Sequence, residues 1–239
     1  AASHARFVHA RGRPVAIAGL RQMLQWVRSV IYTVLLFLGT GFFGVIVLLS
    51  ALLPLSIEQR YVIPRAWGLS LTWLAKVVCG LGYVIEGQEN LPSRPFISLW
   101  KHSSVWETLA QMFVVPPASW SLKREVIWIP IVGWAVSTFK PIAINRSAGH
   151  SAVNQMVQQG RERLATGMGV IVDPEGTRMA PGQTRKYGIS GALLACATGA
   201  RSIWCSCSPP PRTARTVPTS GWPSTPSRTC SGCPTSPTW

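Results

Sequence analysis

The stretch "WKHSSVWETL", from Trp100 to Leu109, runs from the end of an apolar segment into the start of a helix. The apolar residues Phe96–Trp100 predict a short buried strand, and Val105–Phe113 predict an amphipathic helix. Ser104 and Glu107 fit the capping box, in which the serine caps the helix and the acid three residues later caps back. A strand that leads into a capped helix is typical of α/β proteins.

His102 and Glu107 have two interpretations. Five residues along a continuous helix turn the two side chains about 140° apart, so they meet only if His102 lies before the helix. The capping box allows that geometry. The carboxylate would then fix the imidazole tautomer, leaving the other ring nitrogen free to take a proton from a substrate hydroxyl. A helix start alone also explains Glu107, so this pattern does not decide between catalysis and capping.

Apolar and helical segments alternate between residues 83 and 201. The predicted strands are Tyr83–Glu86, Phe96–Trp100, Ser119–Lys123, Pro141–Asn145 and Gly169–Val172. The predicted helices are Val105–Phe113, Ser151–Ala165 and Ser190–Ala197. This order predicts an α/β domain at 83–201, a mixed sheet flanked by helices.

Residues 29–82 are predicted to be membrane-associated helices. No residue between Ser29 and Ile57 is charged, and the run is longer than a buried core helix or a signal peptide usually needs. An amphipathic stretch with tryptophans beside basic residues follows at 60–83. A single membrane crossing and a hairpin that dips into one leaflet both fit.

The chain is strongly basic, with 23 Lys and Arg against 8 Asp and Glu. The basic leader at 1–28 holds five arginines and no acid, which predicts a cytoplasmic N-terminus. The part before Met23 is interpreted as a flexible leader or upstream readthrough. Basic charge suits nucleic acid or anionic lipid. The apolar run favours lipid, and no nucleic-acid-binding motif is present.

Residues 202–239 differ in composition from the rest of the chain. They are rich in Ser, Thr, Pro and Cys and contain no Leu, Asp, Glu or Lys, so we predict a disordered, aberrant tail. A shifted reading frame would produce such a change and leave the sheet C-terminally incomplete. "CSC" and "CSGC" lack structural zinc spacing, and no metal site is expected.

A second motif, "GVIVDPEGTRM", covers Gly169–Met179. A short strand ends at Asp173, and Gly176 lets the backbone approach a ligand closely. Glu175 and Arg178 follow at the strand end, where α/β proteins place their sites. A guanidinium there suits bidentate recognition of phosphate.

These motifs together resemble the 1-acylglycerol-3-phosphate (lysophosphatidic acid) acyltransferase family. The resemblance rests on the spaced His–acid pair, on "PEGTR" roughly seventy residues later, on "PIAINRS" with Arg146, and on "SLKREVIWIPIVGW"; it spans about Met23 to Arg201. The chain departs from the family at two of these positions. Glu107 stands where Asp is commoner, and Asp173 stands where the family usually has an apolar residue, most often Phe. The tail also stands where the family continues with a strand of the "VPV" kind.

The resemblance implies roles for particular residues. His102 would be the general base on the free glycerol hydroxyl of lysophosphatidate, and Glu107 would orient it. Arg146 and Arg178 would hold the substrate phosphate. Glu175 and Gly176 would shape the glycerol pocket, with Thr177 as a further substrate-binding residue.

The resemblance further implies an enzyme that makes phosphatidic acid. No cofactor is expected; acyl-CoA or acyl-ACP (acyl carrier protein) would be the co-substrate. The expected partners are membrane lipids and lysophosphatidic acid, with no nucleic acid. The expected location is a bacterial inner membrane, with the catalytic domain on the cytoplasmic side. Another lysophospholipid or glycerol 3-phosphate as acceptor stays an alternative, as does a catalytically inactive membrane-anchored lipid-binding protein.

Overall fold

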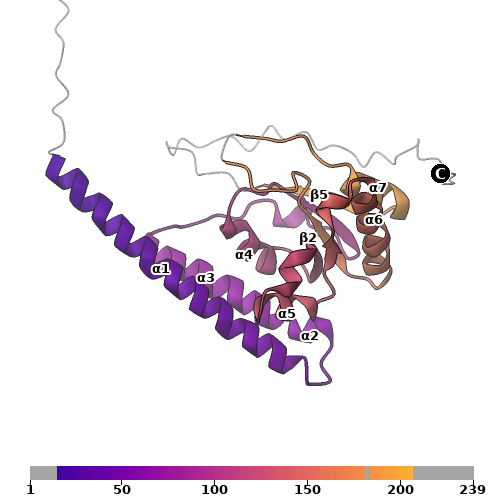
Figure 1. Ribbon diagram of the computed structural model, residues 1–239, viewed down its shortest axis with the longest axis horizontal. Helices are drawn as coiled ribbons and strands as arrows, with labels where there is room; N and C mark the ends of the chain where they lie inside the picture. Colours follow the sequence, from indigo (N-terminus) through magenta and orange to yellow (C-terminus); the bar gives the residue numbers. More distant parts are fainter. Residues whose placement is uncertain (1–14, 181–182, 207–239) are drawn as a thin grey trace, which may run out of the picture.

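A five-stranded sheet lies at the centre of the computed structural model, which describes residues 15–180 and 183–206 (Figure 1). Its strands are β1 (Phe96–Trp100), β2 (Ala118–Lys123), β3 (Ile142–Ile144), β4 (Gly169–Val172) and β5 (Arg201–Cys205). The order is β3-β2-β4-β1-β5, and every pairing among these strands is parallel. The α/β class is confirmed, but the sheet is parallel instead of mixed. Helical crossovers between successive strands produce this direction.

Helices cover both faces of the sheet. On one face, α6 (His150–Ala165) and α7 (Ser190–Thr198) bury Met156, Leu164 and Leu194 against Val170 and neighbouring strand residues. The other face carries α4 (Val105–Val114), which ends at a cluster containing Phe96, Trp100 and Ile171. Neighbouring residues of one strand therefore face different helices, as the pleat requires.

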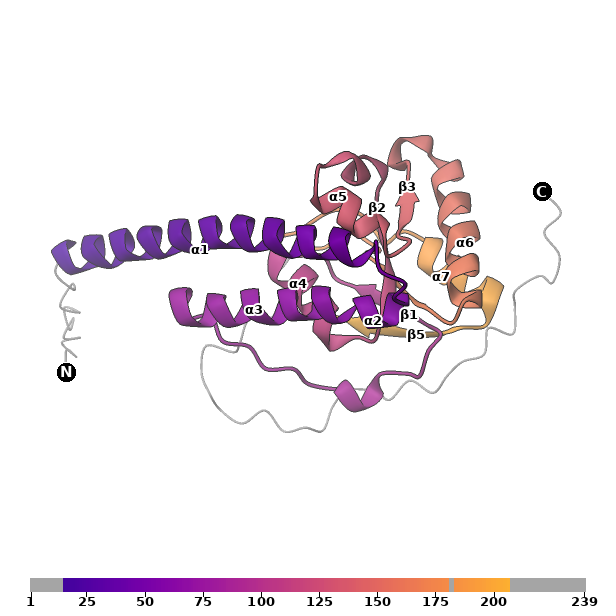
Figure 2. The same cartoon turned by 90° about the horizontal axis from the view of Figure 1, so that it is seen from below.

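Two long helices form an antiparallel hairpin beside the sheet (Figure 2). They are α1 (Val15–Ser50) and α3 (Val62–Cys79), joined through the short α2 (Ile57–Arg60). Near the middle, the indole Nε1 of Trp67 donates to Thr40 Oγ1 at 3.3 Å. Farther out, the hydroxyl of Tyr32 donates to the carbonyl of Leu71 at 3.4 Å. The two apolar stretches therefore pair with each other, as a hairpin requires.

Helix α1 exposes large apolar side chains along most of its described length, from Leu20 to Leu49. Residues Gly19–Ser50 are apolar and long enough to cross a membrane. The helix begins at Val15, so at least residues 15–28 of the expected leader are helical. Residues 1–14 lie outside the described residues.

The hairpin is attached to the domain at two places. Tyr61 stacks on Trp120 of β2 with ring centroids 5.9 Å apart, and it also meets Phe139 after α5 (Val132–Ser137). At Gly68 of α3, an added Cβ would lie 2.6 Å from the carbonyl oxygen of Leu109. The backbones of α3 and α4 are thus in direct contact, which links the hairpin to the helix that carries Glu107.

Most predicted elements are found, with two corrections. Tyr83–Glu86 form no strand, because Tyr83 packs its ring on Trp106 and Phe113 instead of pairing at a sheet edge. Residues 202–205 of the predicted tail belong to β5, which pairs with β1. The predicted disorder from 207 onward falls outside the described residues. The part of the chain that the structure describes also contains three short 3₁₀ helices: η1 (Gln88–Asn90), η2 (Arg124–Trp128) and η3 (Arg146–Ala148).

Candidate active site

The segments that follow β1 and β4 meet at the carboxyl edge of the sheet. The two strands pair with Leu99 opposite Val172, so His102 and Asp173 leave the sheet side by side. The backbone N–H of Met179 then donates to the carbonyl of His102 at 2.8 Å. This bond ties the loop containing "PEGTR" directly to the histidine, and the two motifs form one site.

His102 and Glu107 are in direct contact through Nδ1 and Oε1. His102 lies before α4 and Glu107 in its first turn, which is the geometry that the capping box predicted. The other carboxylate oxygen, Oε2, accepts from the backbone N–H groups of Ser103 at 2.7 Å and Ser104 at 3.2 Å. The hydroxyl of Ser103 donates to it as well, at 3.0 Å. Glu107 is completely buried, so these bonds hold the carboxylate in place.

The contact changes the proton affinity of both partners. Its hydrogen bond to Glu107 raises the pKa of His102 above the ordinary 6.5, although burial opposes this. Burial favours the neutral form of Glu107, but hydrogen bonds from His102 and Ser103 outweigh it and lower the pKa of that carboxyl. Glu107 is therefore ionised near neutral pH. It stabilises a proton on the imidazole.

Two arginines lie at the open side of this site. Arg146, at the start of η3, donates from Nη1 to the carbonyl of Gly176. Gly176 has φ +66°, a conformation that other residues rarely adopt. Thr177 and Arg178 are exposed on the same loop, and the charge of Arg178 acts on His102 by lowering its pKa. The charge of Arg178 thus reaches His102, while Arg146 contacts Gly176 and acts on Asp173; both arginines have solvent access.

Glu175 is buried below the loop. Its Oε1 accepts from Lys101 Nζ at 2.9 Å, and Lys101 also donates to the carbonyl of Gln183 at 3.0 Å. Glu175 Oε2 is buried without a hydrogen-bond partner among the described residues. Lys101 is therefore occupied by protein groups, and it fixes the shape of the loop. A role for it as a free phosphate ligand does not fit this geometry.

Asp173 is a second carboxylate beside the histidine. Its Oδ1 is buried and has no hydrogen-bond partner within residues 15–180 and 183–206. Burial raises the pKa of this carboxyl to about 6, with smaller influences from His102, Glu107 and Arg146. Asp173 therefore changes charge at a pH near 6, under the electrostatic influence of His102, Glu107 and Arg146.

Ser103 was not predicted as part of the site. Glu175 was predicted to shape the glycerol pocket, but its ion pair with Lys101 was not predicted. A signal for Ser103 exists in the sequence, because it precedes the capping serine and its N–H lies within reach of the same carboxylate. Nothing local indicates the Lys101–Glu175 pair, since 74 residues separate its members. Among the described residues, no three His, Cys, Asp or Glu side chains are grouped as a metal site would require.

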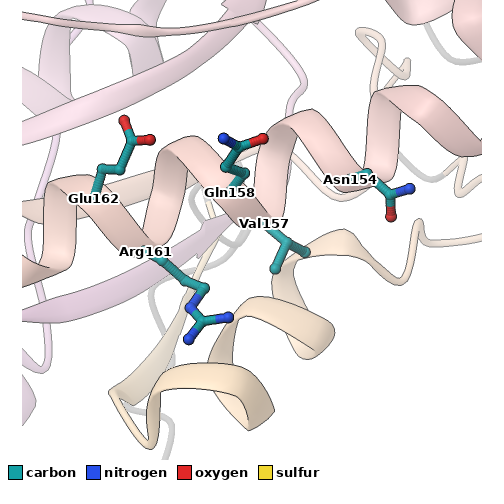
Figure 3. A pocket seen from close by; sticks show the side chains of 5 residues that line it. All are labelled: Asn154, Val157, Gln158, Arg161 and Glu162. Carbon is teal, nitrogen blue, oxygen red and sulfur yellow. The ribbon is translucent and has the colours of Figure 1, made fainter. Parts of the chain in front are cut away.

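A hollow on the surface of α6 lies apart from these residues (Figure 3). Its lining comes from that helix alone: Asn154, Val157, Gln158, Arg161 and Glu162. It contains no residue of the two motifs and no histidine. The residues of the two motifs lie at the ends of β1 and β4, and this hollow contains none of them.

Comparisons with known proteins find similar sequences over much of the chain. The model of a family described as Acyltransferase matches residues 83–213. A protein of Pseudomonas aeruginosa named 1-acyl-sn-glycerol-3-phosphate acyltransferase is 37% identical over 177 residues, which are 74% of this chain and 68% of that protein. A Saccharomyces cerevisiae protein of the same name is 26% identical over 159 residues, 66% of this chain. The chain spans about half of the yeast protein, 51%.

A solved structure shares the fold. It is the crystal structure of the 1-acyl-sn-glycerophosphate (LPA) acyltransferase from Thermotoga maritima, with a TM-score of 0.61 and 21% sequence identity. The match covers 76% of this chain and 73% of that one. The arrangement of the strands and helices is therefore one that a solved protein also adopts.

Proposed function

This chain belongs to the acyltransferase family, and from that premise we propose that it transfers an acyl group from a thioester to the free hydroxyl of 1-acyl-sn-glycerol 3-phosphate. The product is phosphatidic acid, an intermediate of phospholipid biosynthesis. The contact between His102 and the buried Glu107 is the observation that carries the proposal. It supplies a base with a fixed tautomer at the edge of a sheet, with two arginines beside it.

His102 is the general base. Because its Nδ1 hydrogen donates to Glu107, Nε2 is the nitrogen with a free lone pair. Nε2 takes the proton of the acceptor hydroxyl while that oxygen attacks the thioester carbonyl. The new C–O bond forms, the C–S bond breaks, and the departing thiolate takes the proton back from Nε2. Glu107 stabilises the imidazolium between these steps and forms no bond to the substrate.

Arg146 and Arg178 bind the phosphate of the acceptor. Their exposed guanidinium groups flank the loop after β4, and each can offer two parallel N–H donors to phosphate oxygens. Gly176 and Thr177 lie between them and shape the glycerol pocket. Glu175 supports this loop from below through Lys101. The phosphate fixes the position of the acceptor, and the free hydroxyl then reaches the histidine.

The membrane is the source of the acceptor. Helix α1 exposes an apolar surface that a lipid bilayer would cover. The lipid acceptor is dissolved in the same bilayer. The donor, acyl-CoA or acyl-ACP, comes from the aqueous side. We therefore place the catalytic domain on the cytoplasmic side of a bacterial inner membrane. No cofactor takes part in this reaction.

The test is acyl transfer by the full chain in membranes, with labelled acyl-CoA and labelled acyl-ACP in separate reactions. Lysophosphatidate, glycerol 3-phosphate and an uncharged-headgroup lysophospholipid are offered as acceptors. We expect labelled phosphatidic acid from lysophosphatidate, and about 10²–10⁴-fold less of it from the His102→Ala variant. Transfer only to one of the other acceptors would refute the assignment of the substrate. Equal transfer by the variant would refute the assignment of the base.

A further inference from the structure

The segment between β2 and β3 exposes four large apolar side chains within seven residues. We call this the tryptophan platform; it consists of Trp128, Ile129, Ile131 and Trp134. Trp128 is 73% exposed and Trp134 is 53% exposed. Indole rings left in water are unusual on a soluble domain, and a patch of them marks a surface that something covers.

The platform is built against α1. Ile131 has φ 63°, which is an outlier for a β-branched residue, and its Cγ2 would lie 2.8 Å from a Cβ added at Gly44. Ala135, the fourth residue of α5, is buried with Val47 of α1 and Tyr61 in one cluster. The platform is therefore held at a fixed position beside the C-terminal half of α1 (Figures 1 and 2).

The apolar surface continues from the platform onto α1. Phe42 and Leu49 are exposed on the same half of that helix, while Gly44 and Val47 face the domain. Because the platform is packed against α1, a bilayer that surrounds α1 would also lie next to the platform. Continuity with α1 thus distinguishes the platform from an isolated exposed aromatic residue.

Basic side chains border the platform. Lys123 and Arg124 stand five and four residues before Trp128 and are both exposed. Lys123 pairs with Glu125 at 3.3 Å, whereas Arg124 has no ion pair among the described residues. Tryptophan beside arginine and lysine is the composition that membrane–water interfaces favour, with the indole at headgroup level and the cation near lipid phosphates.

We propose that the catalytic domain itself rests on the bilayer through the tryptophan platform, with Trp128 and Trp134 at headgroup depth in the leaflet that holds α1. The occupant of the surface is lipid, and anionic headgroups lie against Arg124. Contact at α1 and at the platform fixes the tilt of the domain on the membrane. The inference rests on the placement of α1 in lipid and not on acyl transfer.

Fluorine NMR on the full chain tests this directly. The protein is labelled with 5-fluorotryptophan and placed in lipid nanodiscs, with nitroxide-carrying lipids added as broadening agents. Resonances are assigned with single Trp→Phe variants at Trp26, Trp128, Trp134 and Trp204. Trp26 on α1 is the positive control at 68% exposed. Trp204 on the edge strand β5 is the matched negative control at 46% exposed, since β5 and β3 form opposite edges of the described sheet.

We expect nitroxide to broaden the resonances of Trp26, Trp128 and Trp134 and to leave Trp204 sharp. A label near the headgroup should broaden Trp128 and Trp134 more than a label at the end of the acyl chain. Sharp Trp128 and Trp134 signals beside a broadened Trp26 would overturn the proposal, as would equal broadening of Trp204. Shifts of these signals with protein concentration, without nitroxide broadening, would identify a second copy as the occupant and refute lipid. A sharp Trp26 would refute the inference together with its premise.

Discussion

Replacing Asp173 by asparagine removes a buried carboxylate whose Oδ1 has no hydrogen-bond partner among the described residues. In the folded protein burial raises the pKa of this group from 3.8 to about 6. A raised pKa means that the folded state prefers the protonated form. The stability that protonation contributes is fully present below about pH 4 and is lost as the pH rises through about 6.

The magnitude follows from the difference between the two pKa values. At 1.36 kcal/mol for each pKa unit, ionised Asp173 costs the folded protein at most about 3 kcal/mol above pH 6. Asp173→Asn should therefore raise the free energy of unfolding at about pH 7.5 and have little effect at about pH 4. The amide keeps the size of the side chain, so packing changes little.

The assay is urea unfolding in detergent micelles, followed by tryptophan fluorescence at both pH values. Glu125→Gln is the matched control, because it removes an exposed carboxylate whose ion pair with Lys123 lies in solvent. It should leave stability unchanged at either pH. A gain for Asp173→Asn that is equal at both pH values, or absent at the higher one, would refute the conclusion that an ionised carboxylate is buried here.

Three further predictions concern the site and its support. Arg146→Ala and Arg178→Ala should each raise the KM for lysophosphatidate more than the KM for the thioester, and steady-state kinetics with a larger effect on the thioester would reassign them. Gly68→Val should lower the Tm and reduce the free energy of unfolding by about 1–3 kcal/mol, because the added side chain would meet the backbone of α4. An unchanged Tm would show that α3 does not contact α4 at this position. Because a base must be neutral, kcat/KM should fall on the acid side with a midpoint above 6.5. Asp173→Asn should move this midpoint to lower pH, because it removes a charge that raises the pKa of His102. An unmoved midpoint in the pH–rate profile would show that the charge of Asp173 does not act on His102.

The sequence predicted the elements whose signals are local. β1 and β4 have the predicted bounds, because each is a short apolar run that ends at a polar turn. The capping box at Ser104 and Glu107 placed both the start of α4 and the His102 contact. One short segment determines both the start of the helix and the His102–Glu107 contact, so the sequence alone was enough to predict this part of the site.

Features that depend on distant partners were missed. "YVIE" at 83–86 has the composition of a strand, yet Tyr83 is used to cover α4, and composition does not distinguish packing from pairing. Residues 202–205 were assigned to the tail because its average composition is polar. Their backbone groups nevertheless pair with β1, and that pairing depends on the neighbouring strand. The Lys101–Glu175 pair arises only when the ends of β1 and β4 are adjacent.

The most direct test of the acyl-transfer mechanism is the turnover of His102→Ala beside Glu107→Gln, in membranes supplied with lysophosphatidate and acyl-CoA. Ser137→Ala, which removes a hydroxyl bonded within α5, is the control for a conservative change away from the site. We predict that His102→Ala loses about 10²–10⁴-fold in kcat, the usual contribution of a general base. Glu107→Gln should lose part of that, while both variants stay membrane-bound and folded. Near-normal turnover by folded His102→Ala would contradict the account, because the account assigns the proton transfer to His102.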